Sequence, residues 1–206
     1  MRLGYSDIWR AIAAAYPDRL AVTGGGRSHT YAELADRAGR LAGLLREAGI
    51  GRGDRVAIFL PNRPEYVIAL FGILALGATP VPVNFRYRAS ELAALLDDCG
   101  ARALLYPRTL AEVIRALPEP SGSVRLWLRV DDAGDPATVR DDEVAFDAIE
   151  DRAPETLPAA PPDGELFLYT GGTTGTPKAV EWDLADLLEV QLFSIYGAIG
   201  DRKSVV

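Results

Sequence analysis

The sequence predicts an α/β fold in which parallel sheets are flanked by helices. Three observations lead to this prediction. Short apolar runs alternate with stretches of helical periodicity along the chain. The run Arg55–Leu60 (RVAIFL) is almost continuously apolar, as in strands buried on both faces of a parallel sheet. Hydrophobic residues make up 49% and charged residues 25% of the 206 residues, which is enough apolar material for one large domain or two small ones.

The first expected helix is capped by Ser6 and ends before Pro17, and a strand over Leu20–Thr23 then leads into a turn of three glycines. A second helix starts at Thr30, because Thr30 followed by Glu33 forms a capping box. Its apolar residues recur at spacings of three and four, which is the pattern of an amphipathic helix. These residues are Leu34, Ala38, Leu41, Leu45 and Ala48.

The segment after the strand 55–60 is the most apolar of the chain. Tyr66–Val83 contains 18 residues without a charge, which touches the lower limit for a transmembrane helix. Gly77, Pro80 and Pro82 interrupt its second half. We therefore expect a buried helix of about 12 residues, a turn and a strand over Thr79–Val83, and no membrane span.

The later elements continue the alternation of strands and helices, and one segment breaks it. That segment, 151–164, is rich in proline and has no periodicity, so it is predicted to be a semi-rigid connector. The expected elements are a helix over Ser90–Asp97, a strand over Ala103–Tyr106, a short helix over Leu110–Leu117, a strand over Val124–Val130, a strand over Glu165–Tyr169 and a helical stretch over Asp183–Ile199.

The charge balance bears on the partners of the protein. The net charge of −7 argues against a nucleic-acid binder that works by neutralising phosphates. Ten acidic residues and two arginines lie between Asp131 and Glu155, a stretch that we expect to be a solvated surface insert. Arginine supplies 20 of the 22 basic residues, so the two lysines, Lys178 and Lys203, stand out.

Few single residues point to catalysis, and none is assigned a catalytic role. Cys99 is the one cysteine, so no internal disulfide or cysteine-based zinc site is expected, and the chain is predicted to be cytoplasmic, with Cys99 as a buried filler. His29 is the one histidine and is predicted to face solvent in a turn, without a catalytic triad. The tryptophans are expected to pack in the core or at its edge; for one of them, Trp182, the alternative is an acyl pocket. No metal ligands are identified.

The segment 169–180 (YTGGTTGTPKAV) directly follows a predicted strand and has the composition of a phosphate-binding loop. Its glycines let backbone N–H groups approach an anion, its threonines add hydroxyl donors, and its lysine adds a positive charge. The alternative is an ordinary surface turn. The predicted phosphate-binding residues are Thr170, Gly171, Gly172, Thr173, Thr174, Gly175, Thr176 and Lys178.

This loop differs from the common motif G-x-x-x-x-G-K-[ST]. In that motif the lysine follows a glycine and opens a helix, whereas here Pro177 precedes Lys178 and Ala179 follows it. Pro177 also pushes the residue before it toward an extended conformation. We therefore expect the chain to continue as a strand through Ala179 and Val180, which makes the segment a strand-loop-strand clasp for a polyphosphate.

The same segment resembles the signature loop of the adenylate-forming (AMP-binding) enzymes, [YF]-T-S-G-[ST]-T-G-x-P-K-G-V, a family that includes acyl-CoA synthetases, adenylation domains of peptide synthetases and firefly luciferase. Two positions differ: Gly171 stands for serine and Ala179 for glycine. Further stretches are similar to the N-terminal half of an acyl-CoA synthetase, so the resemblance covers nearly the whole chain. They are TYAEL from Thr30, GDRVA from Gly53, Pro61-Asn62, Gly77-Ala78, VPVN from Val81 and SEL from Ser90.

The resemblance implies that residues 1–206 form a partial, incomplete N-terminal AMP-binding domain, without the small C-terminal domain. It implies a ligase that uses ATP and Mg²⁺ to join a carboxylic acid to AMP and then passes the acyl group to coenzyme A. The double glycine, Gly171-Gly172, is similar to that of some bacterial ligases acting on fatty acids or steroid side chains.

Several family motifs have no counterpart in this sequence, which leaves two functional hypotheses open. The missing motifs are an aromatic-Gly-x-Thr-Glu segment, a Thr-Gly-Asp motif and the catalytic lysine of the C-terminal domain. We therefore expect the 206-residue chain alone to be inactive. The first hypothesis is a part of an acyl-CoA synthetase. The second is a non-catalytic remnant or a nucleotide-binding regulatory module.

Overall fold

The computed structural model describes residues 4–118, 123–132, 140–153, 164–170 and 178–191. Its helices are α1 (Tyr5–Ala15), α2 (Tyr31–Glu47), α3 (Pro64–Ala75), α4 (Ala89–Cys99) and α5 (Ala111–Arg115), with short 3₁₀ helices η1 (Arg108–Leu110) and η2 (Phe146–Asp151) and a further helix over 184–191. Its strands are β1 (Leu20–Gly24), β2 (Arg27–Thr30), β3 (Arg55–Ile58), β4 (Thr79–Pro82), β5 (Ala103–Pro107), β6 (Leu126–Val130), β7 (Glu143–Ala145), β8 (Glu165–Thr170) and β9 (Lys178–Asp183).

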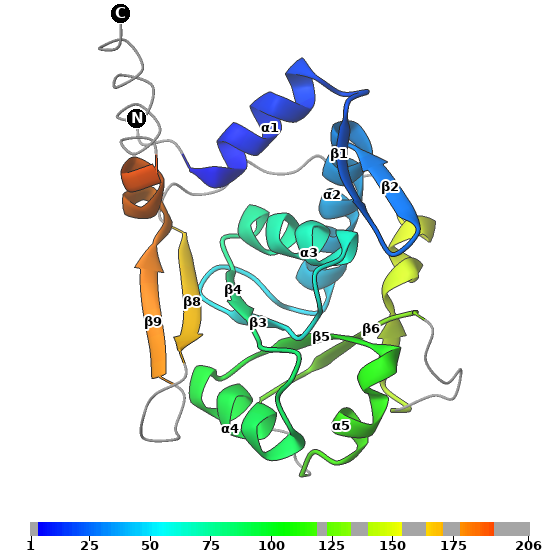
Figure 1. Cartoon of the computed structure of the whole chain (residues 1–206), viewed down its shortest axis with the longest axis vertical. Coiled ribbons are helices and arrows are strands. Elements are labelled where there is room, and N and C mark those ends of the chain that lie inside the picture. Colours follow the sequence, from blue (N-terminus) through cyan, green and yellow to red (C-terminus); the bar gives the residue numbers. More distant parts are fainter. Residues whose placement is uncertain (1–3, 119–122, 133–139, 154–163, 171–177, 192–206) are drawn as a thin grey trace, which may run out of the picture.

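A five-stranded sheet in the order β4-β3-β5-β6-β7 lies at the centre of the molecule, and all of its neighbouring strands are parallel. Helices α2 and α3 cover one face of this sheet, and α4 and α5 cover the other (Figure 1). The fold class expected from the sequence, α/β with a parallel sheet flanked by helices, is confirmed.

Two hydrophobic cores follow from the alternation of side chains along the strands. In β3, Val56 and Ile58 pack into the core under α2 and α3, whereas Ala57 packs into the core under α4 and α5. The expected apolar stripe of α2 faces the first core, and the capping box at Thr30 is present, because Glu33 N–H donates to Thr30 Oγ1 at 3.3 Å. Both faces of the sheet are therefore buried, as the apolar run 55–60 predicts.

The prolines of β4 explain where the central sheet ends. Thr79 and Val83 donate their N–H groups to carbonyls of the β3 side, at Asp54 and Ile58. The alternate positions, Pro80 and Pro82, therefore face the outer edge, where they have no N–H to donate. Strand β8 lies beside β4, but it belongs to a separate antiparallel hairpin with β9 (Figure 1).

The N-terminal region differs from the prediction in two details. Helix α1 is capped at Gly4, not at Ser6, because the Asp7 carboxylate accepts the Gly4 N–H at 3.1 Å while Ser6 is buried within the helix. The glycine turn joins β1 to a second strand, β2, that the sequence analysis did not predict. Gly25 and Gly26 both have positive φ, which is the backbone of a tight two-residue hairpin turn.

The prediction for His29 is wrong. His29 lies in β2 and only 6% of its surface is exposed, because the strand turns its side chain toward α2. There Arg37 Nη1 lies 3.5 Å from His29 Nε2. The sequence analysis placed this residue in a solvent-facing turn because it did not recognise the second strand of the hairpin.

The acidic stretch 131–155 is not a solvated insert in the part that the structure describes. Strand β7 extends the central sheet, and Phe146 and Ile149 of η2 are fully buried in the core under α2 and α3. The Glu143 carboxylate pairs with Arg129 and accepts the hydroxyl of Tyr106. The prediction considered only the charges of this stretch and overlooked Phe146 and Ile149, which pack the segment against the sheet. The predicted connector at 151–164 lies mostly outside the described residues.

The three tryptophans differ in how deeply they are buried. Trp127 is buried as predicted, and Trp9 is partly buried and stacks on Phe71 with ring centroids 4.0 Å apart. Trp182 is 41% exposed, so it does not lie in the core, and the two other expectations for it, packing at the edge of the core or lining an acyl pocket, stay predictions. Within the ranges that the structure describes, no helix is long and apolar enough to cross a membrane.

Candidate functional site

The predicted phosphate loop is carried by the β8–β9 hairpin. Tyr169 pairs with Ala179 and Thr170 with Lys178, so both ends of the segment 171–177 meet at one end of the hairpin. The expected continuation of the chain as a strand after Pro177 is confirmed, since β9 begins at Lys178. The remaining predicted site residues, Gly171, Gly172, Thr173, Thr174, Gly175 and Thr176, lie outside the described residues.

Side chains of β8 anchor the hairpin on the main body of the molecule. Phe167 and Tyr169 pack against the core under α4 and α5. The hydroxyl of Tyr169 donates a hydrogen bond of 2.6 Å to Oδ2 of Asp98, in the last turn of α4. Burial of the phenol, together with this bond to the carboxylate, raises the pKa of Tyr169. The residue that precedes the loop is thus held from two sides.

The end of α4 that receives Tyr169 is itself fixed. Gly100 ends the helix in the left-handed conformation, and Arg55 Nε donates to the Cys99 carbonyl at 2.6 Å. A side chain at Gly100 would meet the Arg55 guanidinium, because a Cβ there lies 2.8 Å from Nη2. Cys99 is buried as predicted, and burial raises the pKa of its thiol to about 11.

The opposite end of the hairpin is anchored separately. Asp183 Oδ1 accepts the N–H groups of Ala185 and Asp186 at 2.8 and 3.1 Å and so caps the helix over 184–191, in agreement with the expected helical stretch. Leu184 N–H donates to the Gly164 carbonyl at 2.9 Å. The two ends of the hairpin therefore depend on different contacts.

The charges of the hairpin are segregated along its length. Lys178 lies at the loop end, and Glu165, Glu181 and Asp183 lie toward the other end. Burial, followed by the repulsion of Glu181, raises the pKa of Glu165. An anion is therefore repelled from the end of the hairpin that carries Glu165, Glu181 and Asp183.

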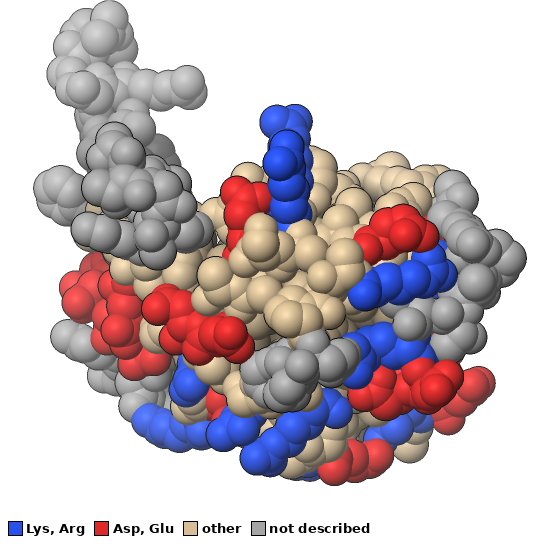
Figure 2. Space-filling view, turned by 90° about the horizontal axis from the view of Figure 1, so that it is seen from below, with Lys and Arg blue, Asp and Glu red and all other residues tan. Residues whose placement is uncertain are grey.

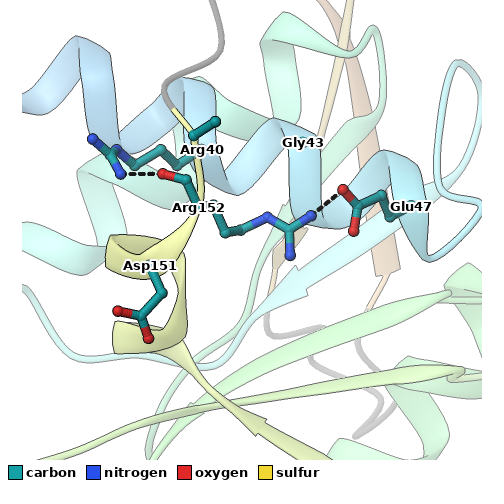
Figure 3. Close-up of a pocket in the computed structure, with 6 residues that line it drawn as sticks. Arg40, Gly43, Glu47, Asp151 and Arg152 are labelled. Atoms are coloured by element: carbon teal, nitrogen blue, oxygen red, sulfur yellow. Dashed lines mark hydrogen bonds and ion pairs between the residues drawn. The ribbon is translucent and has the colours of Figure 1, made fainter.

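Two cavities of the described part of the chain lie elsewhere. One of about 280 Å³ lies between α2 and the end of η2, where Arg40 donates to the Arg152 carbonyl and Arg152 pairs with Glu47 (Figure 3). A second of about 230 Å³ lies between β1 and the start of α3 and is lined by Val22, Thr23, Asn62, Arg63, Tyr66 and Val67. Neither is lined by residues of β8 or β9.

The second cavity lies near the carboxyl end of β3, where the strand order changes direction and doubly wound sheets commonly bind ligands. The charged groups there are paired with each other. Glu65 is only 1% exposed and accepts from Arg63 at 2.7 Å and from Arg27 at 3.4 Å, and Arg63 also pairs with Asp132 at 3.4 Å. This cluster joins the β1–β2 hairpin to α3 and to the chain after β6.

The sequence analysis did not identify Asp98 or Arg55 as part of the site. An available signal was the position of Asp98 at the C-terminal end of a helix, where a negative charge is unfavourable unless a partner compensates it. In the ranges described, no three His, Cys, Asp or Glu side chains gather as a metal site.

Comparisons with known proteins show which family the chain resembles. The family model described as AMP-binding enzyme matches residues 9–202. The chain is 38% identical over 194 residues to a medium/long-chain-fatty-acid–CoA and 3-oxocholest-4-en-26-oate–CoA ligase of Mycobacterium marinum, and this match covers 91% of the chain and 35% of the relative. It is 43% identical over 162 residues to a feruloyl-CoA synthase of Amycolatopsis, which covers 79% of the chain and 30% of that relative.

A solved structure shows the same fold. The inhibitor-bound N-terminal domain of FACL13 from Mycobacterium tuberculosis superposes with a TM-score of 0.73 at 31% identity, covering 89% of this chain and 44% of that one. The chain thus spans about a third of the length of the curated relatives it matches.

Proposed function

The chain belongs to the AMP-binding enzyme family, and we propose from this premise that the protein containing it activates a carboxylic acid with ATP and transfers the acyl group to coenzyme A. The relatives at 38% and 43% identity are both acyl-CoA ligases by name. The observation that carries the proposal is the β8–β9 hairpin, which pairs Thr170 with Lys178 at the two ends of the predicted loop.

The reaction has two steps. A carboxylate oxygen of the acid attacks the α-phosphorus of ATP, and the bond to the β-phosphate oxygen breaks as pyrophosphate leaves. The coenzyme A thiolate then attacks the acyl carbonyl and AMP leaves. In the first step, negative charge develops on the departing pyrophosphate, so catalysis depends on groups that are positioned to stabilise it.

We assign this electrostatic role to the loop. Backbone N–H groups, the hydroxyls of Thr170, Thr173, Thr174 and Thr176, and the Lys178 ammonium would hold the β- and γ-phosphates. None of them acts as a nucleophile. Magnesium bound to the phosphates would neutralise part of their charge.

The acid substrate is proposed to be a fatty acid or a steroid side-chain acid. The name of the Mycobacterium marinum relative and the double glycine at 171–172 favour this class. The feruloyl-CoA synthase of Amycolatopsis makes an aromatic acid the second candidate. Pyrophosphate release in the presence of medium-chain and long-chain fatty acids, a steroid acid and ferulic acid distinguishes the two classes.

Replacement of Lys178 tests the assignment of the loop. We expect Lys178→Ala to slow ATP–pyrophosphate exchange by an amount corresponding to about 2–4 kcal/mol of transition-state stabilisation, because a charge-assisted phosphate contact is lost. Lys203→Ala is the matched control, since Lys203 is the only other lysine of the chain. Equal exchange rates for the two variants would overturn the assignment.

A non-catalytic nucleotide-binding module is the second candidate function. A module of this kind should bind ATP but catalyse no ATP–pyrophosphate exchange in the presence of any of the acids. The corresponding measurement on the protein encoded by the complete gene separates the two functions.

A further inference from the structure

We propose that Asp98 is a positioning residue for the phosphate loop, which it orients by holding Tyr169 at the end of β8. This inference rests on the proposed function, because it concerns the same loop. Asp98 itself does not touch the nucleotide. It acts through one hydrogen bond, from the Tyr169 hydroxyl to Oδ2, between residues 71 positions apart in the sequence.

The bond is short, and it lies at the surface, since Asp98 is exposed. The distance of 2.6 Å between Tyr169 Oη and Asp98 Oδ2 is typical of a hydroxyl that donates to an ionised carboxylate. The Tyr169 ring is partly buried against the core under α4 and α5, so its hydroxyl reaches Asp98 from a fixed direction.

Asp98 stands on a rigid support. Leu95, Leu96 and Cys99, on the same two turns of α4, are buried. The helix end is closed by the Ala101 N–H, which donates to the Leu96 carbonyl at 3.1 Å, and by Arg55, which donates to the Cys99 carbonyl. Movement of Asp98 relative to the central sheet would break these contacts.

The position of Asp98 in its helix is unfavourable for the helix itself. The last turn of α4 contains no basic residue, and a carboxylate there faces the negative end of the helix dipole. The Tyr169 hydroxyl donates a hydrogen bond to this carboxylate. The contact with β8 therefore offsets part of the cost of this charge to α4.

The register of the hairpin transmits the position of Tyr169 to the loop. Tyr169 pairs with Ala179, and the next pair is Thr170 with Lys178, where the loop begins and ends. A shift of Tyr169 therefore displaces two of the proposed phosphate-binding residues together. The other end of the hairpin is held independently by the Asp183 cap and the bond from Leu184 to Gly164.

This separation of the two anchors predicts a kinetic effect without unfolding. Tyr169→Phe, which removes only the hydroxyl, and Asp98→Ala are each expected to lower kcat/KM for ATP about five- to tenfold in ATP–pyrophosphate exchange, the size of effect expected when one solvent-exposed hydrogen bond is lost. KM for the acid and the melting temperature should stay close to those of the unmodified enzyme. Asp98→Asn, which keeps an acceptor oxygen, should restore part of the loss.

Asp97→Asn is the matched control. Asp97 is the neighbouring acid in the same helical turn, it is exposed, and its side chain has no hydrogen bond or ion pair with the part of the chain that the structure describes. This variant changes the net charge and the interaction with the helix dipole in the same way as Asp98→Asn. It is expected to retain the exchange rate of the unmodified enzyme.

The experiment is made on the complete enzyme, with the double variant Tyr169→Phe/Asp98→Ala added. The inference is supported if each single variant loses exchange activity and the double variant loses no more than a single variant does. The inference is overturned if Asp97→Asn loses as much as Asp98→Asn, if the two single losses multiply, or if Tyr169→Phe exchanges normally while Lys178→Ala does not. Normal exchange by Lys178→Ala overturns the loop assignment itself, so the two failures are distinguishable.

Discussion

The environment of His29 affects the response of the fold to pH. Its ring is covered in β2, and burial lowers its pKa, with the guanidinium of Arg37 as the next cause. Arg27 acts in the same direction, whereas the carboxylates of Glu33 and Glu65 oppose them. The folded protein therefore favours the neutral imidazole more strongly than the unfolded chain does.

A pH dependence of stability follows. Because the folded pKa lies below the unfolded value of about 6.5, the stability that His29 contributes is present above about pH 6.5 and is lost as the pH falls below it. The free energy of unfolding in urea should fall more between about pH 7.5 and about pH 5 in the unmodified protein than in His29→Gln. Equal losses in the two proteins would contradict this, since all other titrating groups are shared.

Cys99 offers a second test at the residue scale. Its thiol is buried, and its pKa is raised to about 11, first by burial. Because the thiolate is the reactive form, a thiol reagent at about pH 8 should label the folded protein far more slowly than the urea-unfolded chain. Cys99 is the only cysteine of the chain, so the rate reports on the C-terminal end of α4. Rapid labelling under native conditions would show that this end opens.

At the scale of elements, the contact between α2 and α3 depends on Gly72. A Cβ at Gly72 would lie 2.9 Å from the Ala38 carbonyl oxygen and 3.2 Å from Leu41, so the two helices pack too closely for any side chain there. Helices that approach one another in this way cover the sheet tightly, and added volume forces them apart. The short apolar pattern of α3 does not reveal which of its residues faces α2.

We expect Gly72→Ala to destabilise the protein by about 1–3 kcal/mol, despite the higher helix propensity of alanine. The measurement is the midpoint of urea unfolding, compared with Gly51→Ala. Gly51 has open space around its position, so this control should be close to neutral. A stabilised Gly72→Ala variant would mean that propensity outweighs packing at this contact.

At the scale of the whole molecule, one face of the surface is mixed in charge. Acidic and basic side chains lie next to one another on the face shown in Figure 2. Exposed apolar side chains are present on β9 and the following helix, namely Val180, Trp182 and Val190. Within the described ranges, β9 pairs only with β8, so one of its edges carries backbone groups available for pairing.

The isolated 206-residue chain is predicted to bind ATP weakly and to self-associate. The proposed site supplies contacts to phosphates, whereas most of the affinity for a small ligand comes from an enclosed pocket, and the two cavities described above lie away from β8 and β9. The exposed apolar residues and the edge of β9 favour association. Calorimetry with ATP and magnesium and light scattering test this; micromolar binding by a monomer would support the nucleotide-binding module.

Much of the fold could be predicted because its signals are local. The capping box of Thr30 and Glu33 fixes the start of α2, and the apolar run after Arg55 identifies a strand buried on both faces. Pro177 predicts that Lys178 begins a strand, as β9 does. Each of these signals depends on residues within one or two turns of the chain.

The sequence by itself therefore determined the fold class, the order of most elements, and the strand-loop-strand segment that carries the family resemblance. Only the tertiary structure decided that His29 is buried, that Phe146 and Ile149 dock on the core, and that Tyr169 meets Asp98. These outcomes depend on contacts between segments far apart in the chain. Local propensity contains no information on which distant face will cover a side chain, because that is decided when the helices and strands pack together.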